Sequence, residues 1–180
     1  MRFITDYFRL NQKLFRKPYP LPIINKNIQQ LEGLQYDTTL YINMGYYAMR
    51  LSSASQDMTT IVTEFGKFRY NHLPMGTCTL GYIVQDKVDK LQSDIEGIKT
   101  YINDIIVSRK DLFTNHIEQL RIIFGRLCTS GLKVNTPMCS FGLKEIPHLG
   151  YVITREGIKN YLKKVQGIMD LGQPNTTTEA

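Results

Sequence analysis

One stretch of this chain has a helical periodicity that restricts its fold more than any other feature. Apolar residues recur at spacings of 4, 3, 4 and 3 over Phe113, Ile117, Leu120, Phe124 and Leu127. That spacing places all five side chains on one face of an α-helix, and Gly131 follows as the kind of residue that ends one. We therefore predict an amphipathic helix whose apolar stripe packs into a core.

The rest of the chain alternates between strand-like and helix-like segments. Strands are predicted over 34–42, 45–51, 139–143 and 148–153, with one hairpin over 58–73 that turns at Phe65-Gly66 and another centred on Asn103-Asp104. Further helices are predicted over about 80–94, 23–32 and 161–170. This order predicts an α+β fold, with an antiparallel sheet and helices packed on one face.

The composition fits one globular domain with a basic surface. The 180 residues are 42% hydrophobic and carry a net charge of +6, which permits a core and is compatible with a polyanion partner. No apolar run approaches the roughly 18 residues of a membrane helix, and the opening MRFITDYFRL has no signal-peptide stretch. Three cysteines without a CxxC pair favour a reducing compartment. We therefore expect an intracellular chain, in cytoplasm or nucleus, that is not secreted and has no membrane partner.

A short acidic turn between two apolar strands, Tyr101-Ile102-Asn103-Asp104-Ile105, is the most informative local pattern. A carboxylate at a hairpin tip is held rigidly and reaches solvent, which suits metal binding. The alternative is that Asn-Asp simply makes the turn, since both residues tolerate the dihedral angles it needs. The local pattern leaves both interpretations open.

The neighbouring segments connect this turn to a known family. The chain contains, in order, RFITDYFRLN, RKPYPLP, LEGLQY, NMGYYAMRL, GKFRYNHLPMG, YINDIIVSRK, GLKVN, HLGYVITREGI and KKV. In this order and spacing they resemble the reverse transcriptase domain of long-terminal-repeat retrotransposon and retrovirus-like Pol polyproteins. The resemblance implies a right-hand polymerase palm with a partial fingers region over 1–153, and the start of an incomplete thumb or connection region over 154–180.

The same resemblance implies an activity, cofactors and partners. Enzymes of this family join a primer 3′-hydroxyl to an incoming dNTP on an RNA or DNA template. Two Mg²⁺ ions activate the hydroxyl and stabilise the leaving diphosphate. Three aspartates hold these ions in the family: one at the end of the strand before the GYY block, and two in a Tyr-x-Asp-Asp turn.

This sequence departs from the family at two of those three positions. Tyr41 stands at the strand end and Asn103 at the first turn position, so Asp104 is the one remaining catalytic and metal-binding candidate. Asp37 is about 13 Å from position 41 along a strand and Asp57 lies beyond the next turn, so neither is expected to substitute. An amide oxygen is a poor Mg²⁺ ligand beside a carboxylate. The departures predict impaired metal binding and impaired catalysis.

Other family positions are present. The resemblance assigns nucleotide binding to Arg2, Tyr46, Met75 and Gly76, and primer binding to Leu149, Gly150 and Tyr151 of the HLGY block. Each position also has a structural explanation: a solvated terminal arginine, a core aromatic on a strand, an ordinary strand-to-helix turn and a hairpin turn. The helical stripe and the cysteines are assigned to packing.

Three functional hypotheses remain from the sequence. The first is a reverse transcriptase domain whose RNA-templated DNA synthesis is impaired. The alternative is a non-catalytic palm relic that binds nucleic acid weakly or has no function. A small RNA-binding sheet module is the third, but the segment EFGKFRYNH does not match the aromatic strand pattern of such modules. The sequence gives no indication of the oligomeric state.

Overall fold

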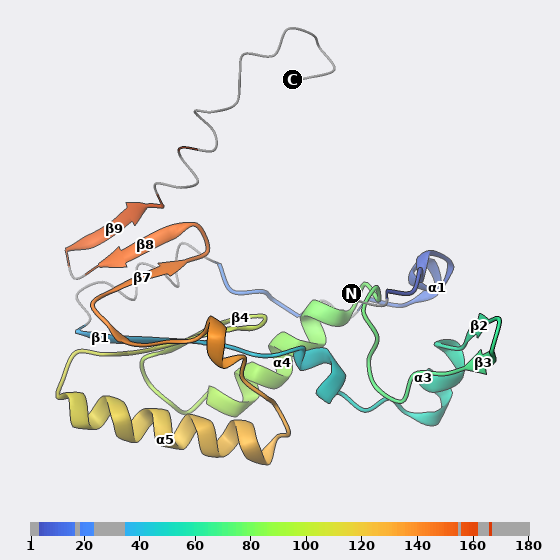
Figure 1. Cartoon of the computed structure of the whole chain (residues 1–180), viewed down its shortest axis with the longest axis horizontal. Coiled ribbons are helices and arrows are strands. Elements are labelled where there is room, and N and C mark those ends of the chain that lie inside the picture. The colour runs from blue at the N-terminus through green and yellow to red at the C-terminus, as the bar shows by residue number, and fades with distance from the viewer. Residues whose placement is uncertain (1–3, 17–18, 24–34, 155, 162–165, 167–180) are drawn as a thin grey trace, which may run out of the picture.

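The computed structural model describes residues 4–16, 19–23, 35–154, 156–161 and 166 (Figure 1). The helices predicted over 23–32 and 161–170 therefore lie almost wholly outside the described residues. No described helix is long and apolar enough to cross a membrane.

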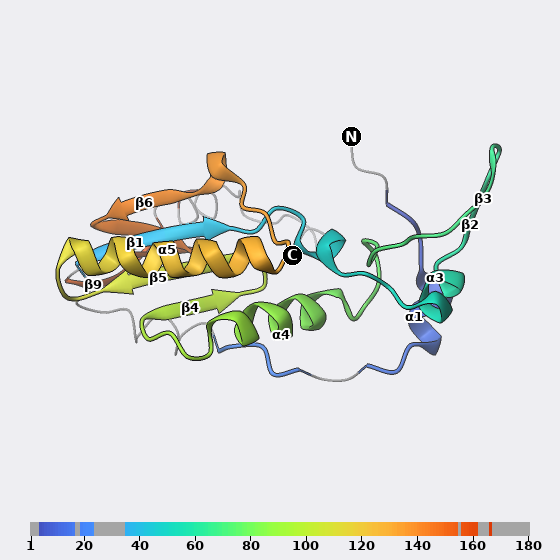
Figure 2. The same ribbon diagram turned by 90° about the horizontal axis from the view of Figure 1, so that it is seen from below.

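A four-stranded antiparallel sheet forms the centre of the molecule. Its strand order is β4 (Ile98–Tyr101), β5 (Asp104–Arg109), β1 (Tyr36–Tyr41) and β6 (Ser140–Leu143). The helices α4 (Leu80–Gln92) and α5 (Phe113–Thr129) lie side by side on one face of this sheet (Figures 1 and 2). The predicted α+β architecture, with helices on one face, is confirmed. We call this sheet, its two helices and the strands above it the palm.

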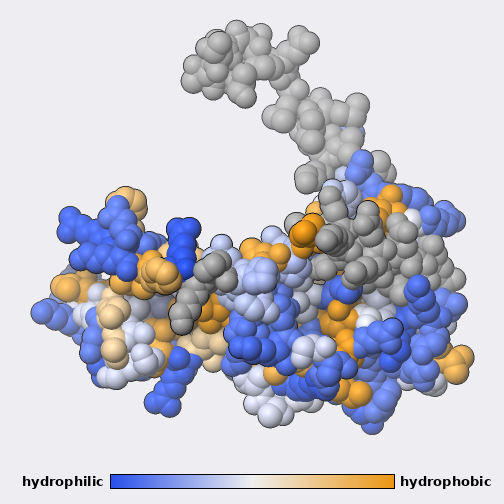
Figure 3. Space-filling model, turned by 180° about the vertical axis from the view of Figure 1, so that it is seen from behind, coloured by the Kyte–Doolittle hydropathy of each residue, from blue (hydrophilic) through white to orange (hydrophobic). Residues whose placement is uncertain are grey.

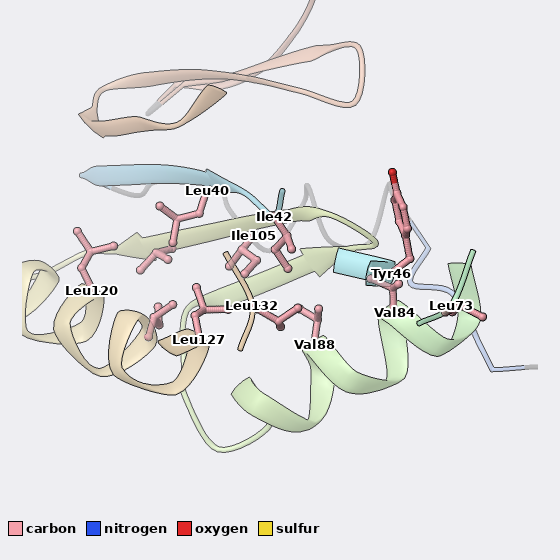
Figure 4. Close-up of a cluster of buried hydrophobic side chains, with 12 residues drawn as sticks. Leu40, Ile42, Tyr46, Leu73, Val84, Val88, Ile105, Leu120, Leu127 and Leu132 are labelled. Carbon is pink, nitrogen blue, oxygen red and sulfur yellow. The ribbon is translucent and has the colours of Figure 1, made fainter. Parts of the chain in front are cut away.

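The two faces of the central strands contribute to two separate apolar clusters. Strand residues alternate between faces, so Leu40 and Ile105 point towards α4 and α5, where they meet Val84, Val88 and Leu127 (Figure 4). Ile106 points to the opposite face. Buried on both sides, β5 carries the continuous apolar run Ile105 to Val107, which explains why its sequence pattern predicted a strand. The neighbouring strand β1 buries the polar Asp37 and Thr38 beside Leu40.

A second sheet covers the face of the central sheet that is opposite the helices. It consists of β7 (Glu145–His148), β8 (Tyr151–Thr154) and β9 (Gly157–Asn160), and its Ile146 and Ile153 pack on Ile106. The prediction of one strand over 148–153 is wrong, because Leu149 (φ 49°) and Gly150 (φ 87°) form a two-residue turn there. Two central residues with positive φ suit the right-handed twist of a tight hairpin.

The remaining elements form a fingers portion at the end of the molecule away from β9 (Figure 1). They are α1 (Phe8–Lys13), α3 (Ser53–Met58), β2 (Ile61–Thr63) and β3 (Gly66–Phe68). The hairpin predicted within 58–73 is confirmed in β2 and β3, but its turn is one residue earlier than predicted, at Glu64 and Phe65, because Gly66 pairs with Thr63. Tyr7, which is buried, donates its hydroxyl hydrogen to the Thr59 carbonyl oxygen at 3.3 Å and packs edge-on against Tyr70.

Another predicted strand needs correction. Residues 45–51 do not continue a strand: Met44 adopts a left-handed φ of 48°, and a 3-10 turn, η1 (Gly45–Ala48), follows it. A second short 3-10 turn is η2 (Thr136–Met138).

The apolar stripe of α5 is only partly buried. Phe113 and Ile117 are 47% and 41% exposed. His116 and Gln119 are buried instead, because the sheet offers them hydrogen bonds: His116 Nε2 lies 2.8 Å from Thr38 Oγ1, and Gln119 bonds to the Glu96 carbonyl oxygen. The buried face of α5 is therefore rotated from the one that its apolar residues predicted.

Candidate functional site

Tyr41 and Asp104 lie directly opposite one another at one end of the sheet. The register of β1 and β5 runs from Tyr36 paired with Arg109 to Tyr41 paired with Asp104. Opposite residues of an antiparallel pair have Cα atoms about 4.5–5.5 Å apart. The prediction that these two positions lie side by side is confirmed. Both side chains leave the sheet on the face that carries Ile106, which is the face under β7 and β8.

The turn that presents Asp104 is shifted by one residue from its predicted centre. Tyr101 pairs with Asp104, so Ile102 and Asn103 are the two turn residues and Asp104 begins β5. Ile102 has a φ of 55°, an uncommon and strained value for a β-branched residue. Asp104 therefore stands on a rigid strand rather than on the mobile tip of a loop.

Several residues with a strained backbone conformation lie near this end of the sheet. Within the described chain, the non-glycine residues with positive φ are Met44, Ile102 and Leu149. Each lies in a turn next to Tyr41, Asp104 or His148. Such conformations cost about 1–3 kcal/mol each and persist where the surrounding structure enforces them, commonly at functional sites. The local backbone thus marks this end of the sheet independently of the side chains it carries.

A hollow of about 290 Å³ connects the sheet end with the turn of β7 and β8. Its lining includes Tyr41 and Asp104 from the sheet, Met138 from η2, and His148 and Leu149 from the hairpin. The structure therefore brings the predicted catalytic position together with Leu149, the first residue of the predicted primer-binding turn. Tyr151 instead packs beside Ile106 and its partners.

Burial disfavours the charged form of two side chains that line this hollow, Asp104 and His148. Burial raises the pKa of the Asp104 carboxyl above its ordinary value. Burial also lowers the pKa of the His148 imidazole to about 4, so this ring is neutral at pH 7.

The donor atoms of the site do not fit a pair of magnesium ions. Asp104 supplies the one carboxylate. Asn103 Oδ1 is sealed from solvent without a hydrogen-bond partner among the described residues, and a Cβ on Gly45 would lie 3.6 Å from it. No cluster of three or more His, Cys, Asp or Glu suited to a metal occurs in the described part of the chain. Mg²⁺ requires several hard oxygen ligands around it, so we derive no chemical step through magnesium here.

Neither of the other nearby carboxylates substitutes for the missing ones. Asp37 is 3% exposed and pairs in register with Ser108, four positions from the strand end. Asp57 lies in α3 of the fingers portion, rather than on the loop expected from the sequence, and forms an ion pair with Arg69 at 2.7 Å. Neither Asp37 nor Asp57 is therefore placed to share an ion with Asp104.

Of the predicted nucleotide-binding residues, Tyr46 and Met75 lie together in the structure, whereas Arg2 is not among the described residues. Tyr46 is 7% exposed and lies among the core side chains (Figure 4). Its hydroxyl donates to Met75 Sδ at 3.1 Å, so these two positions are in contact. Tyr46 belongs to the core cluster and is not among the residues that line the hollow at Asp104.

Gly76 occupies a position where any other residue would be strained. Its φ is 98°, and a Cβ there would lie 2.7 Å from the Thr5 carbonyl oxygen. Asn11 of α1 donates its side-chain amide to the Gly76 carbonyl oxygen at 2.8 Å and accepts from the Cys78 backbone at 2.9 Å. Asn11, which the sequence analysis did not single out, thus attaches this loop to the fingers portion.

The fold is shared with solved reverse transcriptases. A foamy viral protease-reverse transcriptase in complex with double-stranded DNA matches with a TM-score of 0.92 and 23% identity, over 99% of this chain and 31% of that chain. A foamy viral protease-reverse transcriptase in complex with an RNA/DNA hybrid matches with a TM-score of 0.87 and 23% identity, over 97% and 24%. These likenesses define the class of the fold, which is that of the reverse transcriptases.

Sequence relatives give the family. The chain is 31% identical over 180 residues to the retrovirus-related Pol polyprotein from transposon opus and 27% identical to that from transposon 297, both of Drosophila melanogaster. Each alignment covers 99% of this chain but only 18% and 17% of the relative, so the chain spans less than a fifth of their length. No family model matches the chain. The homologues of this chain are therefore retrotransposon Pol polyproteins, and the chain is similar to one segment of them.

Proposed function

We propose that this domain holds template–primer nucleic acid but does not synthesise DNA. The family activity is RNA-templated DNA synthesis from dNTPs with Mg²⁺, and this chain keeps the fold that supports it. The proposal separates two properties that the family combines, the binding of a nucleic-acid duplex and the transfer of a nucleotide to its 3′ end.

The pairing of Tyr41 with Asp104 is the observation that carries the proposal. Two Mg²⁺ ions bring four positive charges, and the family balances them with three carboxylates. Here an uncharged phenol and an amide replace two of those carboxylates. Removing one preorganised group that stabilises a transition state typically costs about 10²–10³ in rate. Two losses in one cluster need not multiply, but one is enough to bring synthesis below ordinary detection.

The support for nucleic-acid binding is electrostatic and comparative. The chain carries a net charge of +6, and the foamy viral structures with the same fold are complexes with double-stranded DNA and with an RNA/DNA hybrid. One face of the molecule is largely hydrophilic, with small scattered apolar patches (Figure 3). Binding through such a surface is weak, independent of sequence, and falls steeply with salt.

Primer extension with Mg²⁺ and dNTPs tests the catalytic half of the proposal. We expect no extension by the unmodified chain above that of an Asp104→Asn control, and recovery in the double variant Tyr41→Asp/Asn103→Asp. Extension by the unmodified chain that exceeds this control would overturn the proposal.

Fluorescence anisotropy with a labelled primer–template tests the binding half. We expect an affinity that decreases strongly between about 50 and 200 mM salt. The alternative, a palm relic without function, predicts no binding at low salt. Tight binding that persists at high salt would contradict the electrostatic interpretation.

We also propose the domain limits and the compartment that the family implies. By the resemblance, residues 1–153 correspond to the partial fingers and palm, and residues 154–180 to the start of a thumb or connection region. Strand β9 (Gly157–Asn160) nevertheless pairs with β8, so the sheet of the palm extends past this limit. The three cysteines, Cys78, Cys128 and Cys139, are all free thiols, which supports an intracellular location in cytoplasm or nucleus.

A further inference from the structure

A buried polar network lies beneath the turn that presents Asp104. Gln85 of α4 is fully buried, and its Oε1 accepts a hydrogen bond from the Ile102 backbone N–H at 2.6 Å. Its Nε2 donates to Asp89 Oδ1 at 2.8 Å and to Thr100 Oγ1 at 2.9 Å. Thr100 also donates to the Asp89 carboxylate. One side chain thus joins the helix, strand β4 and the strained turn.

The bond to Ile102 is the part of this network that affects the site. Ile102 has a φ of 55°, which a β-branched residue adopts only when its surroundings enforce it. Its N–H points below the turn to Gln85, where no strand partner is available to it. A buried N–H without a partner is strongly disfavoured, so the amide of Gln85 favours this conformation over a relaxed one.

The network also reaches the N-terminal extended segment. Tyr19 donates its hydroxyl to Asp89 Oδ2 at 3.0 Å, across 70 residues of sequence. In Figure 2 this blue segment passes alongside α4. A continuous path of hydrogen bonds therefore runs from Tyr19 through Asp89 and Gln85 to the backbone of Ile102.

We infer that Gln85 is a positioning residue that holds the Ile102-Asn103 turn in its left-handed conformation, and that Tyr19 clamps Gln85 in place through Asp89. The orientation of Asp104 at the start of β5 then depends on a side chain that touches neither the hollow nor any ligand. This inference rests on hydrogen bonds within the chain, and it stands whether or not the domain binds nucleic acid.

The same helix offers a matched control. Gln92 lies two turns after Gln85, is 6% exposed, and neither atom of its side-chain amide has a hydrogen-bond partner among the described residues. Substituting Gln92 by Met removes a buried amide from the same helix without touching the turn. A general effect of removing a buried glutamine from α4 should therefore appear in both Gln85→Met and Gln92→Met. An effect specific to the turn should appear in Gln85→Met alone.

The test is amide hydrogen exchange and ¹⁵N–¹H shifts of Ile102, Asn103 and Asp104 in the full chain. Without the bond, Gln85→Met should speed exchange at Ile102 about tenfold and shift its amide resonance. Gln92→Met should leave both within twofold of the unmodified chain. An unchanged Ile102 amide in Gln85→Met, or an equal effect of Gln92→Met, overturns the inference.

Tyr19→Phe tests the clamp and remains informative if Gln85→Met does not fold. This variant removes one hydroxyl at a half-buried position and with it the hydrogen bond to Asp89. Because that bond acts on the turn only indirectly, we expect the exchange rate at Ile102 to rise two- to threefold. No change at Ile102 in Tyr19→Phe would show that the extended segment does not act on the turn. The measurement needs neither nucleic acid nor metal, so its outcome is separate from that of primer extension.

Discussion

In the palm, the central strands have apolar layers on both faces, whereas the fingers portion exposes most of its apolar side chains. Ile105 and Ile106 of β5 are 0% exposed. In β2, β3 and the turn between them, Val62, Phe65 and Phe68 are 74%, 81% and 51% exposed. Between the two portions, Asn11 of α1 bonds to the loop before α4, through the Gly76 carbonyl oxygen and the Cys78 backbone N–H. The palm should therefore unfold as one cooperative unit, and the fingers portion should open locally at lower cost.

The largest expected effect is in the palm core. Ile105→Ala removes a fully buried side chain between the sheet and its helices, and should lower the free energy of unfolding by about 4 kcal/mol. Val62→Ala is the matched β-branched truncation in the fingers portion and should change it by less than about 0.5 kcal/mol. Urea denaturation followed by circular dichroism measures both. Comparable losses would show that the two regions share one core.

The next effect depends on pH and is confined to the palm. His148 has a folded-state pKa of about 4, below its ordinary 6.5, so the unfolded chain binds more protons between these values. Stability is therefore full above about pH 6.5 and falls towards pH 4, by up to about 3 kcal/mol. Burial also lowers the pKa of His116, so His116 likewise reduces the stability as the pH falls. Burial raises that of Asp104, which acts in the opposite direction.

Urea midpoints at pH 7 and pH 4.5 measure this dependence. His148→Asn should reduce the difference between the two midpoints, and the contribution of His116 should remain. His72→Asn, at an exposed position, is the control and should leave the difference unchanged. An undiminished difference in His148→Asn would exclude His148 as the source.

The smallest expected effect concerns the attachment of the two regions. Gly76 and Gly66 both have positive φ, but a Cβ at Gly76 would lie 2.7 Å from the Thr5 carbonyl oxygen, whereas one at Gly66 meets nothing within 4 Å. Gly76→Ala should therefore cost about 2 kcal/mol more than Gly66→Ala. Limited proteolysis should cut the fingers portion of Gly76→Ala faster while the palm stays intact. Equal rates in the two variants would mean that the Thr5 contact does not hold the regions together.

The sequence predicted those parts of the fold in which apolar residues decide the structure. Strand β1, the β2–β3 hairpin and helices α4 and α5 were all expected within a few residues. The buried face of α5 was not, because His116 and Gln119 are polar and become buried only when Thr38 and the Glu96 carbonyl oxygen are in place. Periodicity does not contain that information, since partners distant in sequence determine it.

The sequence predicted which strand positions of the candidate site lie side by side, but not the conformation of the turn between them. The order of the motifs placed Tyr41 beside the Asn103-Asp104 turn, and the strand register agrees. The burial of Asn103 Oδ1 and the one-residue shift of the turn depend on the left-handed Ile102 and on Gln85 below it. Residue preferences favour Asn103 and Asp104 as the turn centre, and they do not reveal that Ile102 adopts the left-handed conformation instead.

The uncharged partner of Asp104 has a consequence for the stability of the palm. Clustered carboxylates repel one another when no cation lies between them, and like charges in one site disfavour ionisation. An ancestor with three aspartates here would have carried that repulsion whenever its metal was absent. With Tyr41 and Asn103 in place, the strand pairing is kept and the repulsion is gone. This palm can therefore fold independently of magnesium, and chelating agents should leave its unfolding transition unchanged.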